Sequence, residues 1–497
     1  MWGDYVTGIA EAISAHQAGD LSRAERIYRK LIDEKRDLFH AKHLLGVLRF
    51  QCGHLQDAGR LIRQALAINS RDDAAHYHHG MVLSALDLDQ DAVASFDRAI
   101  AINPSNAGAH NNRGVALHVM KQYDEAIASF DRALALQANF AEAHHNRGNA
   151  VDALVVLGNE LFEQNRDDEA LACYDKAIAA KPDYAEAHFN KGLLKLSLGE
   201  HDEGWRLYEW RWKMRSFAPF IRDYQPLWQG DADLSGKTIL IDADQGMGDA
   251  IQFCRYLALL RARSCRVIFE VHKPLVPLFH NHDIEVIARG DAPLPAHALP
   301  PFDFYCPLAS LPRAFGTTLD TIPSSTPYLT APQDKIAAWG ELLGEKTKPR
   351  IGVAWSGNPE LQHDLRRTIR LETLLPILGD TVEWFSLQKE VRDHDRETLA
   401  RTPALRDASN RLNDFSDTAA LIAHMDVVIS VDTSVAHLTG ALGKPLWLLL
   451  PFHPDFRWLR ERADSPWYPT ATLFRQTRDG EWSDVLARVS SAKPSIR

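Results

Sequence analysis

Residues 238–260 read TILIDADQGMGDAIQFCRYLALL, and this stretch decides how the second half of the chain folds. Residues 238–242 are a short apolar run rich in β-formers, whereas residues 250–260 space their apolar side chains as a helix does. The turn between them contains Gly246 and Gly248, which permit a sharp reversal and let a ligand approach the backbone closely. A strand, a glycine-rich turn and a helix in this order predict one unit of a parallel α/β sheet.

Asp249 directly follows the second glycine of this turn. The position is one where a helix N-cap is expected, and aspartate is a preferred N-cap residue. The same side chain also suits an acid presented at the mouth of a parallel sheet. The local pattern by itself favours the cap and leaves the functional interpretation open.

A second α/β unit begins at Arg350. The segment IGVAWSGNP, residues 351–359, is typical of a buried strand that ends in a polar, glycine-containing turn. HDLRRTIRL follows at residues 363–371, and TVEWFSLQKE at residues 381–390 predicts the next strand. Because strands and helices alternate, we expect a parallel sheet whose ligands lie at the carboxyl ends of the strands.

The segment DVVISVDTSVAHLTGALGKPLWLLLP, residues 426–451, continues this second unit. It predicts strands at residues 427–431 and 446–450, joined by a helix over residues 436–442 that Gly443 ends. The intervening polar residues, Asp432, Thr433 and Ser434, supply capping groups. Free amides at the start of such a helix, together with the two hydroxyl groups, suit a diphosphate.

His437 lies in the first turn of that helix, and two interpretations are open for it. It is either a hydrogen-bond donor to a phosphate or sugar, or a core histidine whose polar atoms are satisfied internally. Taken alone, the pattern slightly favours the core.

The first 215 residues repeat with a period of 34. Each repeat has a small residue at its eighth position, alanine at its twentieth and a bulky residue at its twenty-fourth, as in Gly114, Ala126 and Phe130. Small residues facing large ones are typical of paired antiparallel helices, and the spacing resembles tetratricopeptide repeats, which stack into an α-solenoid. The pattern restarts only ten residues after Ala141, so we expect a lengthened helix there. The aromatic run at residues 204–212 is expected to dock as a capping helix on the next domain.

Asparagine recurs at the sixth position of three repeats: Asn112, Asn146 and Asn190. An amide both donates and accepts, which suits binding the backbone of an extended peptide without reading its sequence. The arrangement resembles the asparagine ladder in the tetratricopeptide arm of protein O-GlcNAc transferases. Solvated polar positions on a helix are the equal alternative.

The composition is that of an ordinary globular protein, with 45% hydrophobic and 25% charged residues. A net charge of −10 argues against non-specific nucleic-acid binding. The five cysteines show no metal-ligand or disulfide spacing. Because neither a signal-peptide pattern nor an apolar run of transmembrane length is present, we expect a cytoplasmic protein without a membrane span.

Three separated motifs, GMGDAIQFCRYL, WSGNP and DTSVAHLTGALGKP, resemble glycosyltransferase family 9, the heptosyltransferase-like enzymes. The resemblance covers residues 237–489, and the whole layout is similar to bacterial tetratricopeptide proteins that carry such a domain. It implies a GT-B fold, two Rossmann-like domains that face each other across a cleft, with no metal and no cofactor. We therefore expect a solenoid over residues 1–215, a linker over 216–236, an acceptor domain over 237–340 and a nucleotide-sugar domain over 341–497.

The resemblance also implies roles for single residues. Asp249 corresponds to the general base of an inverting transfer. Arg367, with Arg366 as second choice, is the candidate countercharge for the leaving diphosphate, although the family usually has lysine there. The donor-binding set comprises Gly357, Asn358, Arg366, Arg367, Gln388, Asp432, Thr433, Ser434 and His437, and the acceptor loop comprises Gly246, Gly248 and Gln252.

The residues 451–469, PFHPDFRWLRERADSPWYP, differ from the ending of the heptosyltransferases, so ADP-heptose is not assumed as the donor. Their aromatic residues suit stacking on a base or sugar, but packing against the other domain is the commoner fate.

Two functions remain open from the sequence. In the first, the chain is an inverting, metal-independent glycosyltransferase that uses a nucleotide sugar and recruits a protein or peptide acceptor through the solenoid. In the second, the solenoid is an interaction scaffold, and the GT-B unit is inactive or only binds a nucleotide.

Overall fold

The structure, a computed structural model, describes residues 3–220, 226–279, 282–290, 294, 298–360 and 364–492. Residues 221–225 of the expected linker lie outside the described residues. The chain forms two compact units: one consists of Met1–Leu161 and Asp168–Tyr184, and the other of Phe162–Asp167 and Ala185–Arg497.

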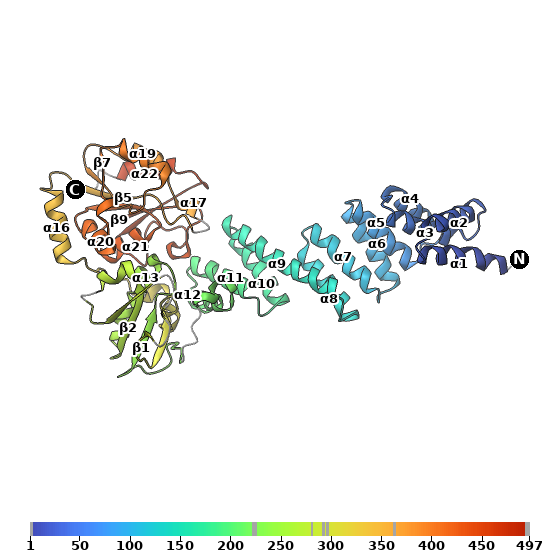
Figure 1. Cartoon of the computed structure of the whole chain (residues 1–497), viewed down its shortest axis with the longest axis horizontal. Helices are drawn as coiled ribbons and strands as arrows, with labels where there is room; N and C mark the ends of the chain where they lie inside the picture. Colours follow the sequence, from blue (N-terminus) through green and yellow to red (C-terminus); the bar gives the residue numbers. More distant parts are fainter. Residues whose placement is uncertain are drawn as a thin grey trace. The chain divides into compact units, whose positions relative to one another are not determined.

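The repeats fold as successive antiparallel helix pairs (Figure 1). The repeat helices are α1 (Gly3–Gln17), α2 (Leu21–Asp33), α3 (Leu38–Gln51), α4 (Leu55–Leu66), α5 (Asp73–Ala85), α6 (Asp89–Ile102), α7 (Ala107–Val119), α8 (Tyr123–Leu136), α9 (Ala141–Glu163), α10 (Asp167–Ala180), α11 (Ala185–Ser197) and α12 (His201–Tyr208). Helix α9 spans 23 residues, which confirms the lengthened helix expected where the pattern restarts.

Small residues contact large ones within each pair, as the repeat pattern predicts. Ala126 and Phe130 of α8 have no solvent exposure. A Cβ atom added to Gly114 would lie 2.5 Å from the Phe130 ring, so only glycine fits there without a shift. Gly148 occupies the same repeat position on α9 but has no neighbour within 4 Å. On α9 the contact between a glycine and a ring is made instead by Gly158, whose added Cβ would lie 2.7 Å from Tyr174.

Two parallel sheets follow the repeats. The first sheet contains β1 (Thr238–Asp242), β2 (Arg266–His272), β3 (Glu285–Arg289) and β4 (Phe304–Pro307), in the order β3-β2-β1-β4. The second contains β5 (Arg350–Ala354), β6 (Glu383–Ser386), β7 (Leu405–Asp407), β8 (Val427–Val431), β9 (Leu446–Leu450) and β10 (Ala471–Arg475), in the order β10-β9-β8-β5-β6-β7. In both sheets the strand order reverses beside the first strand, which is the Rossmann arrangement and confirms the two predicted α/β domains.

The helices of the α/β region are α13 (Met247–Phe253), α14 (Tyr256–Arg261), α15 (Leu311–Ala314), α16 (Gln333–Leu343), α17 (Asp364–Arg367), α18 (Leu371–Leu374), α19 (Asp393–Ala400), α20 (Phe415–Ala423), α21 (Ser434–Ala441) and α22 (Ser483–Ala492). The single helix expected over residues 250–260 is in fact two, because α13 ends at Phe253 and α14 starts at Tyr256.

One buried cluster joins both sheets to the last repeat helix. Trp205 of α12 is 2% exposed, and its ring centroid lies 6.0 Å from that of Phe253 and 5.7 Å from that of Phe456. This confirms that the aromatic run after the repeats docks on the α/β region. The tail aromatics Trp458, Trp467 and Tyr468 are also at most 1% exposed, so packing is their role.

The eighth repeat position gives a matched pair of substitutions. Gly114→Ala is expected to lower the thermal stability of the repeat unit, because overpacking against Phe130 costs about 1–3 kcal/mol. Gly148→Ala is expected to raise it by about 0.5–1 kcal/mol, because alanine is the better helix former and meets open space. Thermal unfolding followed by far-UV circular dichroism measures both, and shifts of the same sign would contradict this account of the packing.

Candidate functional site

The predicted motifs meet where the two α/β domains pack together. The turn after β1 leads into α13, the turn after β8 leads into α21, and these two helices pack against each other. A Cβ added to Gly248 would lie 3.1 Å from Cδ2 of His437, so glycine permits the close approach of the two helix starts. The site therefore lies at the carboxyl ends of both sheets, beside the points where the strand order reverses.

Asp249 is the third residue of α13 and not its N-cap, which corrects the expectation from the sequence. Gly246 is the N-cap residue, and its backbone N–H donates to Oδ2 of Asp249 at 3.1 Å. The other carboxylate oxygen accepts from the Arg457 guanidinium. With 24% of its side chain exposed, Asp249 is held by two donors and still reaches solvent.

Arg457 is the residue of this site that the sequence did not reveal. It lies in the short 3-10 helix η9 (Phe456–Trp458), after β9, and is 8% exposed. Besides Asp249 it binds Oε1 of Gln252 through Nε at 2.5 Å and Oδ1 of Asp455 through Nη1 at 2.8 Å. One buried guanidinium thus joins the two α/β domains.

Gln252, predicted for the acceptor loop, is fully buried and accepts from Arg457. Its acceptor role stays a prediction, as does that of Gly246 and Gly248. The spacing Asp-x-Arg in residues 455–457 was the only signal of Arg457 in the sequence, and it is too short to be specific.

The side chain of Gln388 stabilises the turn after β5 through hydrogen bonds to its backbone. The amide Oε1 of Gln388 accepts from the backbone N–H of Ser356 at 3.2 Å, and Nε2 donates to the Ser356 carbonyl at 3.0 Å. Asn358 is exposed and accepts from the backbone N–H of Glu360 at 3.0 Å, which closes the turn. The structure therefore places Gln388 in the buried interior beside the turn, and Asn358 on the exposed surface of the turn.

Of the two candidate arginines, only Arg367 reaches this turn. Its Nη1 donates to the carbonyl of Asp432 at 2.8 Å, and a Cβ added to Gly357 would lie 2.6 Å from its Nη2. Arg366 instead donates to Oε2 of Glu163 at 2.9 Å, within the same compact unit. The structure brings Gly357, Arg367 and Asp432 together and leaves Arg366 outside this cluster.

Helix α21 begins at Ser434, with Thr433 as its N-cap residue. The first N–H groups of a helix have no partner within the helix, so this end offers donors to an anion. The Thr433 hydroxyl lies 3.2 Å from that of Ser430, and Ser434 is partly exposed. Burial, together with the nearby Asp455 carboxylate, raises the pKa of Asp432 to about 6.

His437 is a buried histidine with an internal partner. It is 6% exposed, its Nδ1 lies 2.9 Å from the Tyr468 hydroxyl, and its ring stacks on Trp458 with a centroid distance of 5.5 Å. Burial, reinforced by neighbouring arginines, lowers its pKa well below the usual value, so the imidazole is neutral at pH 7. Its Nε2, 3.8 Å from Oδ1 of Asp432, therefore makes no ion pair with that carboxyl group.

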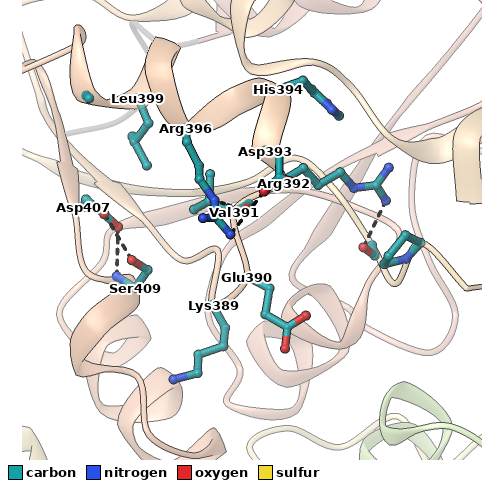
Figure 2. A pocket seen from close by; sticks show the side chains of 13 residues that line it. Lys389, Glu390, Val391, Arg392, Asp393, His394, Arg396, Leu399, Asp407 and Ser409 are labelled. Carbon is teal, nitrogen blue, oxygen red and sulfur yellow. Dashed lines mark hydrogen bonds and ion pairs between the residues drawn. The ribbon is translucent and has the colours of Figure 1, made fainter.

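A pocket of about 840 Å³ opens beside the β5 turn, at the carboxyl ends of β5, β6 and β7 (Figure 2). Gly357 and Arg392 form one wall, and Asp407 and Ser409 form another. The pocket lies wholly in the second α/β domain. Its charged lining suits a polar ligand, and the described residues contain no group of three or more His, Cys, Asp or Glu side chains arranged to hold a metal ion.

Two of the three repeat asparagines are linked through a buried neighbour. Asn112 donates to the Tyr77 hydroxyl at 3.2 Å and accepts from Asn111, whose own Oδ1 accepts from Asn146 at 3.1 Å. Asn112 and Asn146 are partly exposed, so they combine internal bonding with access to solvent. Asn190 lies on α11, in the compact unit of the sheets.

Removing Arg457 is expected to destabilise the α/β unit. Arg457→Ala should lower the free energy of unfolding by about 1–3 kcal/mol, because Gln252, Asp249 and Asp455 each lose the hydrogen bond from the guanidinium. The control Arg462→Ala breaks an exposed pair with Asp464 and should change it by less than about 1 kcal/mol. Urea unfolding followed by tryptophan fluorescence is selective here, because eleven of the 12 tryptophans lie between residues 205 and 482. Equal losses in the two variants would contradict the bridging role.

The titration of Asp432 predicts a pH dependence with a definite sign. A carboxyl group whose pKa is raised from 3.8 to about 6 in the folded state favours folding while it is protonated. Its contribution, of the order of 1–3 kcal/mol, is present below about pH 4 and is lost as the pH rises through about 6. The melting temperature of the wild type, relative to that of Asp432→Asn, should therefore fall as the pH rises from about 4 to about 6. A difference that is constant from pH 4 to 7 would refute the assignment.

Comparison with protein families gives matches in both halves of the chain. The model described as TPR repeat matches residues 158–199, and the model described as tetratricopeptide repeat matches residues 107–140. The model of glycosyltransferase family 9 (heptosyltransferase) matches residues 408–458, which contain β8, α21, β9 and Arg457.

Among curated proteins, FlbA of Caulobacter vibrioides is 26% identical over 320 residues, which cover 60% of this chain and 53% of FlbA. The chain thus spans about half the length of this relative. Among solved structures, MamA matches with a TM-score of 0.29 and 22% identity over 37% of this chain and 96% of its own. YrrB, described as a TPR protein with an unusual peptide-binding site, matches with a TM-score of 0.28 and 24% identity over 37% of this chain and 91% of its own.

None of the helices in the described ranges has both the length and the hydropathy needed to cross a membrane. The repeat pattern, the two parallel sheets and the family matches agree with one another. The chain carries tetratricopeptide repeats, followed by a GT-B-like α/β region in which residues 408–458 match the model of glycosyltransferase family 9.

Proposed function

We propose that this chain is an inverting, metal-independent glycosyltransferase that moves a sugar from a nucleotide-sugar donor to an acceptor recruited by the repeat arm. The observation that carries the proposal is that a carboxylate and a cluster of anion-binding groups, supplied by different α/β domains, belong to one site. Asp249, a carboxylate on the first α/β domain, follows Gly248, which lies against the start of α21 on the second. Arg367 bonds to the carbonyl of Asp432, two residues before that helix. A base beside an anion-binding cluster is what a transfer from a diphosphate requires.

In the proposed reaction, Asp249 takes the proton of an acceptor hydroxyl while that oxygen attacks the anomeric carbon of the donor sugar. The new bond forms between the acceptor oxygen and the anomeric carbon, and the bond from that carbon to the diphosphate oxygen breaks. Attack opposite the leaving group inverts the configuration. Because one Asp249 oxygen is bound by Gly246 and the other by Arg457, the carboxylate has a fixed orientation for this step.

The diphosphate leaves with negative charge, which needs nearby donors. Arg367 and the first-turn amides of α21, with the hydroxyls of Thr433 and Ser434, are proposed to supply them. Asp432, which accepts Arg367 at its carbonyl, orients this group. The adjacent pocket of about 840 Å³ has room for the nucleoside part of the donor.

The acceptor is proposed to be a protein or peptide bound by the repeats. Asn112 and Asn146, joined through Asn111, keep partly exposed amide groups on neighbouring repeats. Two such amides can bind successive peptide groups of an extended chain. The peptide-binding role of Asn190, on α11 in the other compact unit, stays a separate prediction.

The donor step is tested with a panel of nucleoside diphosphates and nucleotide sugars. A ligand at a hundred times its dissociation constant should stabilise the domain that binds it by about 2.7 kcal/mol, which raises the melting temperature by a few degrees. Arg367→Ala should abolish this shift, whereas Arg366→Ala should retain it, because Arg366 is turned toward Glu163.

The base is tested with the nucleotide sugar that this panel identifies. Asp249→Asn should lower turnover by about 10²–10⁴-fold while the melting shift persists, since the amide keeps the shape but accepts no proton. Wild-type protein that binds none of the ligands would refute the proposed donor step and favour the interaction scaffold. Full turnover by Asp249→Asn would refute the base assignment alone.

A further inference from the structure

The turn after β5 is flanked by a second guanidinium, from Arg392, which follows β6 along the chain. Asp364 is 2% exposed and accepts from both arginines: from Nε of Arg367 at 3.1 Å and from Nη2 of Arg392. One buried carboxylate therefore holds two cations at Gly357. Together these three side chains carry one net positive charge. A Cβ added to Gly357 would meet Asp364 at 2.5 Å and Arg367 at 2.6 Å, so glycine permits this cluster to lie against the turn.

The bonds of Arg392 leave part of its donor capacity unused. Its recorded bonds, to Asp364, to the Gly357 carbonyl at 3.2 Å and to the Thr368 hydroxyl at 3.3 Å, all come from Nη2. In the part of the chain that the structure describes, Nε of Arg392 is buried without a partner, and so is the hydroxyl of Ser356, a residue only 3% exposed. Buried donors without acceptors are costly, so both groups are suited to an acceptor that a ligand supplies.

Both Gly357 and Arg392 line the pocket of about 840 Å³. Figure 2 shows the Arg392 side chain extending away from its own segment, where its Nη2 donates to the Gly357 carbonyl, and Arg396 turned back toward Val391. Arg396 bonds to the Val391 carbonyl and pairs with Asp393, three residues earlier on α19. The two arginines therefore share one pocket but differ in whether they face the turn.

We propose that Arg392 is a second cation for the donor diphosphate, acting with Arg367 and the Ser356 hydroxyl, so that the pocket selects nucleoside diphosphates over nucleosides and monophosphates. This inference rests on the donor site proposed above. The diphosphate lies at Gly357, where two guanidiniums can each bind phosphate oxygens, and the nucleoside extends along the ends of β6 and β7. Asp364 keeps the two like charges in place before the ligand arrives.

The experiment measures binding and needs no acceptor. Isothermal titration calorimetry on the full chain uses three probes that share one base: the nucleoside, its monophosphate and its diphosphate. Arg392→Ala should weaken diphosphate binding by roughly 10- to 100-fold and leave nucleoside binding within about twofold, because charged hydrogen bonds to phosphate are lost and base contacts are kept. Arg396→Ala, the comparison variant in the same pocket, should leave the ratio of diphosphate to nucleoside affinity unchanged, because Arg396 bonds to its own segment and not to the β5 turn.

Arg392→Lys tests whether weaker binding by Arg392→Ala comes from lost phosphate contacts or from a folding defect. Lysine keeps the charge but cannot bind phosphate through a planar fork, so diphosphate affinity should fall between those of wild type and Arg392→Ala. A loss that is equal for nucleoside and diphosphate, or no loss in either variant, would overturn the role of Arg392 while wild-type binding still supports the donor site. Wild type that binds none of the probes would overturn the donor site itself, and this inference with it.

Discussion

The buried guanidinium of Arg457 is the interaction on which the arrangement of the two α/β domains depends. A cation that has left water must have its donors satisfied, and the acceptors here come from both domains: Asp249 and Gln252 from the first and Asp455 from the second. The orientation of Asp249 is thus coupled to the loop after β9. Because the same guanidinium lies over the rings of Phe253 and Phe456, the apolar packing and the charge pairing favour one and the same arrangement.

Around this ion pair, the helix starts of α13 and α21 approach closely because the residue between them is glycine. Gly248 lies against the ring of His437, and that ring is kept neutral by burial. A charged imidazole there would face Arg457, Arg255 and Arg367, all of which disfavour protonation. Cations and carboxylates are therefore paired in the interior of the site: Arg457 bonds to Asp249 and Asp455, and Asp364 accepts from Arg367 and Arg392.

The repeats are organised by a different constraint, the fit of a large ring against a glycine on the partner helix. That fit holds at Gly114 with Phe130 and fails at Gly148, where α9 continues for 23 residues. The register shift in the sequence made this break visible, because the repeat restarts ten residues after Ala141 instead of 34. Three strands, β4, β7 and β10, were not predicted. Of these, β7 has only three residues and two of them are exposed, so its pairing with β6, and not its own pattern, makes it a strand.

The sequence by itself determined the helical repeats, the two α/β units and the strands at Val427–Val431 and Leu446–Leu450, which the structure has at the predicted residues. These features follow from burial that is periodic along a short segment, so a local pattern records them. Only the tertiary structure decided that Asp249 pairs with Arg457, 208 residues away, and that Arg367 and not its neighbour Arg366 faces the β5 turn. Adjacent arginines are equivalent in a sequence, and they become different only when the packing of distant segments sets which acceptor each can reach.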